Sequence, residues 1–169
     1  EFSRLAEKFQ VDVWEAIEIA NRHPRVEILQ PGPGVGGHCI SVDPWFFVEK
    51  APQEAQLIQQ ARLVNDSQPE FVLQLLQEEF GSIKEKTFAV LGATYKPDVD
   101  DIRESPAIAI IELLEGAGAV VKAYDPFVKG SQGALPYQVE SLDEACSESD
   151  GILLLVNHRQ FDTLEPARL

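Results

Sequence analysis

Cys39 is the side chain in this sequence best suited to covalent chemistry. It ends the segment PGPGVGGHC (residues 31–39), in which two prolines and four glycines precede a single thiol. Glycines let a backbone approach a ligand closely, and prolines limit how far a loop can wander. A cysteine thiolate is a strong nucleophile, so the segment favours nucleophilic catalysis. On these residues alone, a buried structural cysteine is an equally good interpretation.

Asp43 lies four residues after Cys39 and directly before Pro44. Its carboxylate could act on a water near the thiol, or it could equally cap the helix that we expect to start between residues 40 and 44. The positive end of that helix would lie close to the sulfur. His38 adjoins the cysteine, but adjacent residues do not face one another in regular structure, so a His–Cys pair is weakly supported.

Lys96 and Arg103 are two cations in the segment YKPDVDDIRES (residues 95–105), which separates a predicted strand from a predicted helix. They can hold a phosphate or diphosphate through charge-assisted hydrogen bonds. The alternative is a solvated loop in which both cations pair with neighbouring carboxylates. Asp125 ends the next predicted strand, where a carboxylate can bind a ribose, although Asp-Pro is also an ordinary turn sequence.

His23 and Arg25 follow a predicted helix, where basic groups complement the helix dipole. Cys146 has no glycine-rich surroundings and is interpreted as structural. It and Cys39 are the only two cysteines, so neither a disulfide framework nor a CxxC metal site is predicted. A reducing cytoplasm therefore fits best, and no metal is expected.

The composition limits the classes of partner. The chain has 169 residues, a formal net charge of −14 and 44% hydrophobic residues, enough apolar side chains for a sizeable core. A strongly acidic protein repels phosphate backbones and anionic lipids, so we expect neither nucleic acid nor a membrane as a partner. No apolar run reaches 18 residues, which argues against a spanning helix.

The predicted elements divide the chain into two parts. Helical periodicity extends over residues 1–81. Asp12 is the expected cap of a helix that buries Trp14, Ile17 and Ala20. Pro69 either kinks a helix or starts one. The rest alternates strands and helices, with strands in KTFAVLGA, AVVKAYDP and GILLLVN. This order predicts an α/β fold: a helical segment, then a Rossmann-like domain with a parallel sheet over residues 86–169.

Three segments together resemble one family. They are RHPRVEILQPGPGVGGHCISVDPWFFVEKAP, ARLVNDSQP and YKPDVDDIRESPA. They are similar to the UDP-sugar 6-dehydrogenases of the UDP-glucose/GDP-mannose dehydrogenase superfamily, above all to the bacterial UDP-N-acetyl-D-mannosamine dehydrogenases. The UDP-glucose branch more typically has GFGGSCFxKD where this chain has GVGGHCISVDP.

The resemblance implies a chemistry for the cysteine loop. Cys39 would capture the aldehyde formed by a first hydride transfer, and the thiohemiacetal would give a second hydride to NAD. The thioester that remains would be hydrolysed to a uronic acid, with Asp43 associated with that hydrolysis. Oxidation of an aldehyde by hydride transfer needs a tetrahedral adduct first, which a thiolate readily forms.

The resemblance also implies binding roles. His23, Arg25 and Gly36 would contact the nucleotide-sugar, with Arg25 reaching across a dimer interface. Tyr95 and Lys96 would bind the UDP-sugar from the second domain. Arg103 would touch the pyrophosphate of NAD, although the turn after the first predicted strand lacks the GxGxxG sequence of a dinucleotide site.

The resemblance further implies a longer protein with an NAD-binding domain, a central dimerisation domain (here residues 1–81) and a UDP-binding domain (86–169). Because Glu1 reads as the middle of a helix, we expect a fragment that lacks the NAD domain and a catalytic lysine and does not turn over alone. A homodimer or higher homo-oligomer is expected. Three other readings stay open: a thiol hydrolase, a non-catalytic module for dimerisation and nucleotide-sugar binding, and a dehydrogenase of UDP-glucose, UDP-N-acetylglucosamine or GDP-mannose.

Overall fold

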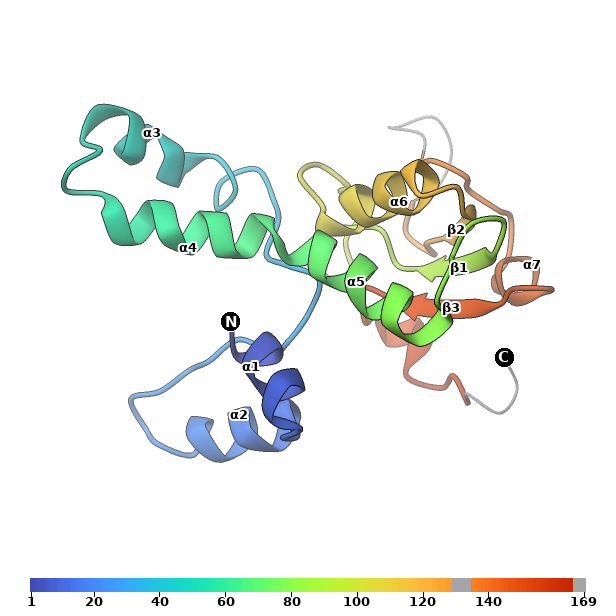
Figure 1. Ribbon diagram of the computed structural model, residues 1–169, viewed down its shortest axis with the longest axis horizontal. Helices are drawn as coiled ribbons and strands as arrows, with labels where there is room; N and C mark the ends of the chain where they lie inside the picture. Colours follow the sequence, from blue (N-terminus) through green and yellow to red (C-terminus); the bar gives the residue numbers. More distant parts are fainter. Residues whose placement is uncertain (129–134, 166–169) are drawn as a thin grey trace.

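A computed structural model describes residues 1–128 and 135–165 of the chain. Figure 1 shows a small hairpin of α1 and α2, an arm formed by α3 and α4, and a lobe built around a sheet. The helices that precede the sheet are α1 (Phe2–Phe9), α2 (Val13–Asn21), α3 (Asp43–Lys50), α4 (Gln56–Asp66) and α5 (Gln68–Phe80). None of the helices among the described residues has the length and hydropathy needed to cross a bilayer.

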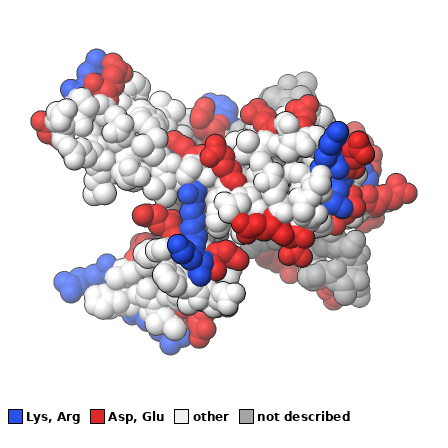
Figure 2. Space-filling view, viewed as in Figure 1, with Lys and Arg blue, Asp and Glu red and all other residues white. Residues whose placement is uncertain are grey.

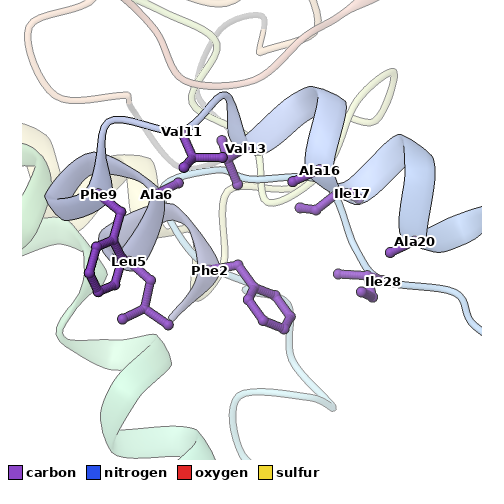
Figure 3. Close-up of a pocket in the computed structure, with 10 residues that line it drawn as sticks. All are labelled: Phe2, Leu5, Ala6, Phe9, Val11, Val13, Ala16, Ile17, Ala20 and Ile28. Atoms are coloured by element: carbon purple, nitrogen blue, oxygen red, sulfur yellow. The ribbon is translucent and has the colours of Figure 1, made fainter.

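The α1–α2 hairpin has little core of its own. Asp12 caps α2 as predicted, because its Oδ1 accepts the N–H groups of Trp14 at 2.8 Å and Glu15 at 3.1 Å. Ile17 is buried, but Trp14 is 58% exposed, contrary to the prediction, since α2 turns its Ile17 face toward α1. Figure 3 shows apolar side chains of both helices, of Val11 in the turn between them and of Ile28 around an open hollow. The volume of this hollow is about 320 Å³.

Pro69 starts a helix and does not kink one. The chain leaves α4 at Ser67, and α5 begins with proline in its first turn, where the missing N–H is not needed. α5 then packs against α6 (Pro106–Gly116), and its residues Val72, Leu76 and Phe80 pack against the core of the sheet lobe. The division of the chain between residues 81 and 86 stays a prediction.

The sheet has three parallel strands in the order β2-β1-β3, which confirms the predicted α/β fold. β1 (Thr87–Leu91) lies in the centre, with β2 (Val120–Tyr124) on one side and β3 (Gly151–Leu154) on the other. The connections from β1 to β2 and from β2 to β3 contain α6 and α7 (Leu142–Cys146). Because the neighbours of β1 lie on opposite sides, a crevice is expected between the loops that follow β1 and β3.

Two apolar clusters hold the sheet lobe together. The larger cluster contains Phe88, Val90 and the buried apolar side chains of α6, and the smaller one contains Ala89, Leu91 and Cys146. Cys146 is buried, which agrees with its interpretation as a structural residue. Burial also raises the pKa of its thiol. Figure 2 shows acidic side chains gathered over this lobe, whereas the α3–α4 arm presents mostly uncharged surface away from its end.

The glycines before Cys39 bring their loop against the sheet lobe. A Cβ on Gly36 would lie 2.1 Å from the carbonyl oxygen of Glu104, a distance that no side chain could tolerate. Gly37 has φ +96°, and a Cβ there would lie 3.0 Å from the ring of Tyr95. The N–H of Gly37 donates to the Glu104 carbonyl at 3.3 Å. Backbone packing within the chain therefore requires these glycines, whatever they do for a ligand.

This packing predicts that Gly36→Ala destabilises the protein by about 1–3 kcal/mol, the usual cost of forcing an extra carbon into a close contact. Gly32→Ala is the matched control in the same loop, because a Cβ there would meet no atom within 4 Å. Urea unfolding of both variants measures the difference. Equal stability of the two variants would contradict the close approach of Gly36 to Glu104.

Candidate functional site

Cys39 lies in a turn that leads directly into α3. Its carbonyl accepts the N–H groups of Val42 at 3.1 Å and Asp43 at 2.8 Å, and its side chain is exposed. The helix starts at Asp43, inside the predicted interval, and Val42 occupies the cap position. The Asp43 side chain makes no capping hydrogen bond, so the cap interpretation of this residue was wrong. Its carboxylate is exposed beside the positive end of α3.

Cys39 and Asp43 line the same hollow, of about 350 Å³. The hydrogen bond between their backbones places them one helical turn apart, which brings a thiol and a carboxylate to one surface. The rest of the lining is apolar and comes from Ile40, Pro44, Phe47 and Ile58. Such a hollow can present a nucleophile and a proton acceptor to one bound carbon atom.

A second cavity, of about 220 Å³, lies at the carboxyl ends of β1 and β3. Its walls are the loops after these two strands, the first turn of α6 and the beginning of the loop that leads to Cys39. Ser105 caps α6 by accepting the N–H of Ala107 at 3.3 Å. The lining residues are Gln30, Pro31, Pro33, Gly34, Thr94, Tyr95, Pro97, Ser105, Pro106, Ala107, Leu155, Val156 and Asn157.

Lys96 and Arg103 differ in their surroundings. The Nζ of Lys96 lies 5.5 Å from the centre of the Tyr95 ring, and no ion pair joins it to a carboxylate of the described residues. Arg103 instead donates to Asp101 from Nε at 2.9 Å and from Nη2 at 2.7 Å. These bonds lower the pKa of Asp101 to about 2 and raise that of Arg103. The charged-loop alternative thus describes Arg103 correctly and Lys96 incorrectly.

His23 and Arg25 lie apart from both cavities. They are exposed in the loop after α2, and the N–H of Arg25 donates to Nδ1 of His23 at 3.3 Å. Neither residue lines the hollow of Cys39 or the cavity at the strand ends. A role in binding the substrate of the same chain is not supported by this geometry, and a role across a dimer interface stays a prediction.

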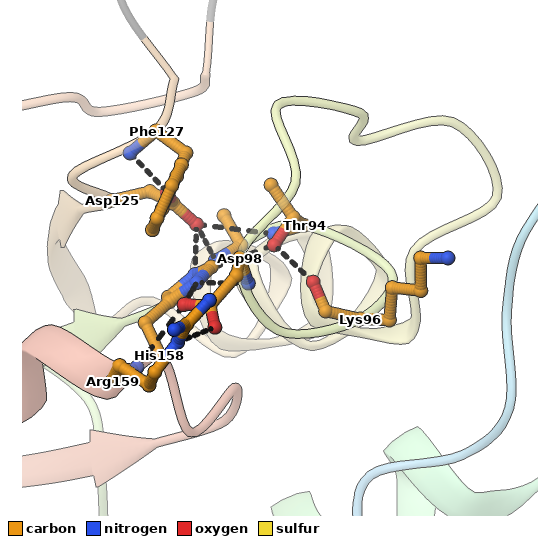
Figure 4. A network of polar contacts seen from close by, with 8 residues as sticks. Thr94, Lys96, Asp98, Asp125, Phe127, His158 and Arg159 are labelled. Carbon is orange, nitrogen blue, oxygen red and sulfur yellow. Dashed lines mark hydrogen bonds and ion pairs between the residues drawn. The ribbon is translucent and has the colours of Figure 1, made fainter. Parts of the chain in front are cut away.

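A buried polar network lies beneath the Lys96 loop, and the sequence alone does not reveal it (Figure 4). Asp125 is 2% exposed, and its Oδ2 accepts the N–H of Ala93 at 2.7 Å and of Thr94 at 3.2 Å. Its Oδ1 accepts the N–H of Phe127 at 2.9 Å. With its oxygens occupied by the chain itself, Asp125 has a structural role, which favours the turn interpretation over ribose binding.

His158 completes this network from the loop after β3. Its Nδ1 accepts the N–H of Asp98 at 2.9 Å, so the proton of the neutral ring sits on Nε2, which donates to Asp125 at 3.0 Å. The guanidinium of Arg159 donates to Asp98 at 2.6 Å and lowers the pKa of that carboxyl. The loops after all three strands are thereby tied together. An aspartate and a histidine at the ends of two predicted strands, Asp125 and His158, were the sequence signals that could have indicated this network.

Two family models match most of the chain. The model described as the UDP-glucose/GDP-mannose dehydrogenase family, central domain, matches residues 1–67, and that of the same family's UDP binding domain matches residues 89–169. The chain belongs to the UDP-glucose/GDP-mannose dehydrogenase family. The second match contains the Lys96 loop and most of the lining of the cavity at the strand ends, and the lining residues from Gln30 to Gly34 belong to the first match.

Individual relatives agree with this assignment. The chain is 46% identical over 169 residues to the UDP-N-acetyl-D-mannosamine dehydrogenase of Methanocaldococcus jannaschii, covering 98% of this chain and 37% of that protein. It is 45% identical over 171 residues to the NDP-N-acetyl-D-galactosaminuronic acid dehydrogenase of Ralstonia nicotianae, covering 100% of this chain and 40% of that protein. The chain thus spans about 40% of the length of these relatives.

A solved structure gives the same result for the fold. The UDP-D-ManNAc dehydrogenase from Pyrococcus horikoshii superposes with a TM-score of 0.84 at 36% identity, covering 97% of this chain and 38% of that chain. The UDP-N-acetyl-mannosamine dehydrogenase from Staphylococcus aureus gives a TM-score of 0.82 at 41% identity, with the same coverage. The helical segment and the sheet lobe therefore both have the arrangement of this dehydrogenase family.

The described residues of this family member do not fit a dinucleotide. The turn after β1 has one glycine, Gly92, and a Cβ there would lie 2.7 Å from Val156, so the residue serves packing between two strand ends. A pyrophosphate site of the usual kind needs glycines that let the phosphates approach a helix N-terminus. Among the described residues, no cluster of His, Cys, Asp and Glu could hold a metal ion.

Proposed function

We propose that the chain supplies the nucleophile and the nucleotide-sugar site of an NAD-dependent UDP-N-acetylmannosamine-type 6-dehydrogenase. The observation that carries this proposal is the contact between two loops. Gly36 and Gly37, which lead to Cys39, pack against Glu104 and Tyr95, which flank the Lys96 loop. A thiol nucleophile and a candidate phosphate-binding cation thus belong to loops that meet, within a chain of the family described above.

Cys39 supplies the covalent step. When the C6 alcohol has lost one hydride and one proton, the thiolate adds to the aldehyde carbon and the carbonyl oxygen takes up a proton. The resulting thiohemiacetal loses a second hydride from C6 and its hydroxyl proton, which leaves a thioester. The exposed side chain of Cys39 in an apolar-lined hollow is open to a sugar C6 carbon.

Asp43 supports the hydrolysis of the thioester. Water must lose a proton as it attacks the acyl carbon, and the thiolate of Cys39 leaves. Asp43 lines the hollow that contains the thiol, and an exposed carboxylate one turn away can accept that proton. The products are the free cysteine and the uronic acid.

The cavity at the strand ends binds the UDP part of the substrate in this proposal. It lies where open α/β sheets bind ligands, at the start of α6, where the positive end of the helix dipole favours an anionic phosphate. Lys96 lies in the chain between two lining residues, Tyr95 and Pro97, and is free of ion pairs with the described carboxylates. In this proposal its side chain brings positive charge to a cavity whose lining has none. Tyr95 lines the same cavity. Gly36 does not line it, and in this proposal it contacts the sugar from the cysteine loop.

NAD is the proposed acceptor of both hydrides. The described residues do not form a site for NAD, so in this proposal they do not catalyse the reaction alone. Other residues hold the dinucleotide, and Arg103 approaches its pyrophosphate. Arg103 is exposed and already oriented by Asp101, which suits a contact at a domain surface. We place the reaction in the reducing cytoplasm, because it needs a free thiol.

A second candidate substrate has the galacto configuration. The relative from Ralstonia nicotianae is named as an NDP-N-acetyl-D-galactosaminuronic acid dehydrogenase. This chain is 45% identical in sequence to it and 46% identical to the N-acetylmannosamine enzyme of Methanocaldococcus jannaschii. Both substrates carry a 2-acetamido group. Parallel assays with the two UDP-sugars and NAD decide between them.

A homodimer through residues 1–81 is the proposed assembly. The helices of this segment leave large apolar side chains in solvent, and Leu57 on α4 is 81% exposed. Phe9 and Phe47 are 68% and 62% exposed. Together with the largely white surface of the α3–α4 arm in Figure 2, this exposure favours contact with a second copy. Arg25 would then reach the substrate of the partner.

In the full-length product of the gene, Cys39→Ser is expected to abolish formation of the uronic acid from the UDP-sugar and NAD. The hydroxyl of serine is a far weaker nucleophile at neutral pH than a thiolate. The matched control is Cys146→Ala, which removes the buried thiol of the sheet lobe and leaves acid formation intact. Normal acid production by the Cys39 variant would refute the nucleophile assignment, and thioester hydrolysis without NAD would favour a thiol hydrolase.

Lys96→Ala is expected to weaken UDP binding by about 1.5–3 kcal/mol, the range for a hydrogen bond to a charged group. Titration calorimetry with UDP measures this change. The control is Lys84→Ala, because Lys84 is an exposed lysine that precedes β1 at the opposite end of the sheet. An unchanged affinity in the Lys96 variant would argue against its role.

Light scattering of the full-length product is expected to give at least twice the mass of one chain. Leu57→Glu should shift the protein toward monomer, because a charge would be buried in the interface. Val120→Glu places the same charge at a residue that is 51% exposed on β2, outside residues 1–81, and should leave the mass unchanged. A monomer at high concentration would contradict the assembly.

A further inference from the structure

Asn65, in the last turn of α4, holds the backbone of the loop that leads to Cys39. Its Oδ1 accepts the N–H of Val35 at 2.7 Å, and its Nδ2 donates to the carbonyl of the same residue at 3.1 Å. One side chain thus satisfies both backbone groups of Val35, as a neighbouring strand would. The partners are 30 positions apart in the sequence, so this is a tertiary anchor and not a local turn.

The anchor lies at the entrance to the cysteine turn. Two residues after Val35, the N–H of Gly37 is bound by the Glu104 carbonyl, and the Gly37 carbonyl accepts the N–H of Ser41 at 3.3 Å. The turn that carries Cys39 begins directly after these two points. Its exit is α3, which packs against α4. Both ends of the turn are therefore held against α4, the helix that carries Asn65: one end through Val35 and the other through α3.

We propose that Asn65 is a positioning residue for Cys39. It acts through the backbone of Val35 and holds the thiol at the place where the aldehyde carbon forms. The inference rests on the proposed role of Cys39 as the nucleophile. Addition of sulfur to a carbonyl depends on distance and angle of approach, and a displacement of about 1 Å can cost on the order of 10²-fold in rate.

The chain provides a matched control for this anchor. Asn21, at the end of α2, accepts the N–H of Ile28 at 2.7 Å and donates to the carbonyl of Ile28 at 2.9 Å. Truncation of either asparagine removes the same two kinds of hydrogen bond. Ile28 lies farther from Cys39 along the loop, and the docking of Val35 and Gly37 intervenes, so only the Asn65 pair should affect the thiol.

The test measures kcat and KM of the full-length product with the UDP-sugar and NAD. Asn65→Ala is expected to lower kcat for acid formation at least about tenfold and to change KM less than about threefold. Asn65→Asp, which keeps the acceptor for the N–H of Val35, should fall between this variant and the wild type. Asn21→Ala should keep kcat within about twofold, at a comparable loss of thermal stability.

Equal effects of Asn65→Ala and Asn21→Ala on kcat would overturn the positioning role, and so would a loss confined to KM. If Asn65→Ala does not fold, the kcat of Asn65→Asp decides in the same way. Cys39→Ser separates this inference from the proposed function. If the Cys39→Ser variant still forms the acid, Cys39 is not the nucleophile and the proposed function fails. If that variant forms no acid but the Asn65 variants keep full kcat, only the positioning role of Asn65 is refuted.

Discussion

The approach of Gly36 to the Glu104 carbonyl is the contact on which the candidate site depends. It sets the distance between the loop that carries Cys39 and the loop that carries Lys96, because a Cβ at Gly36 would lie 2.1 Å from that oxygen. The same oxygen accepts the N–H of Gly37. One backbone carbonyl thus joins a loop of the helical segment to the start of α6, and a side chain on either glycine would separate them.

The Glu104 carbonyl can serve this purpose because a buried network fixes the loop before it. Burying the carboxylate of Asp125 has a desolvation cost, which hydrogen bonds from Ala93, Thr94, Phe127 and His158 offset. His158 extends the network to the N–H of Asp98. The ends of β1, β2 and β3 are thereby held together below the cavity, which leaves Lys96 free to face outward, as Figure 4 shows.

Local signals in the sequence were enough to predict the elements, and tertiary contacts explain what they missed. Asp12 and Ser105 cap their helices through bonds to residues two or three positions away, so their patterns are visible in the sequence. Trp14 was misplaced because helical periodicity cannot show which face finds a partner. Gly36 meets Glu104, and His158 meets Asp98 and Asp125, across separations of at least 33 positions in the sequence, so no spacing rule reveals these contacts.

Two residues of the Lys96 loop adopt left-handed backbone conformations that glycine would favour. Asp98 has φ 60° and Glu104 has φ 51°, and each is held by contacts that offset the strain. His158 and Arg159 hold Asp98, while the carbonyl of Glu104 binds Gly37. The strained positions are thus two of the points at which the loop is attached to its surroundings. The second attachment leads directly to the turn of Cys39. Under the proposed function, a nucleotide that shifts the loop at Glu104 would therefore also shift the backbone that carries the thiol.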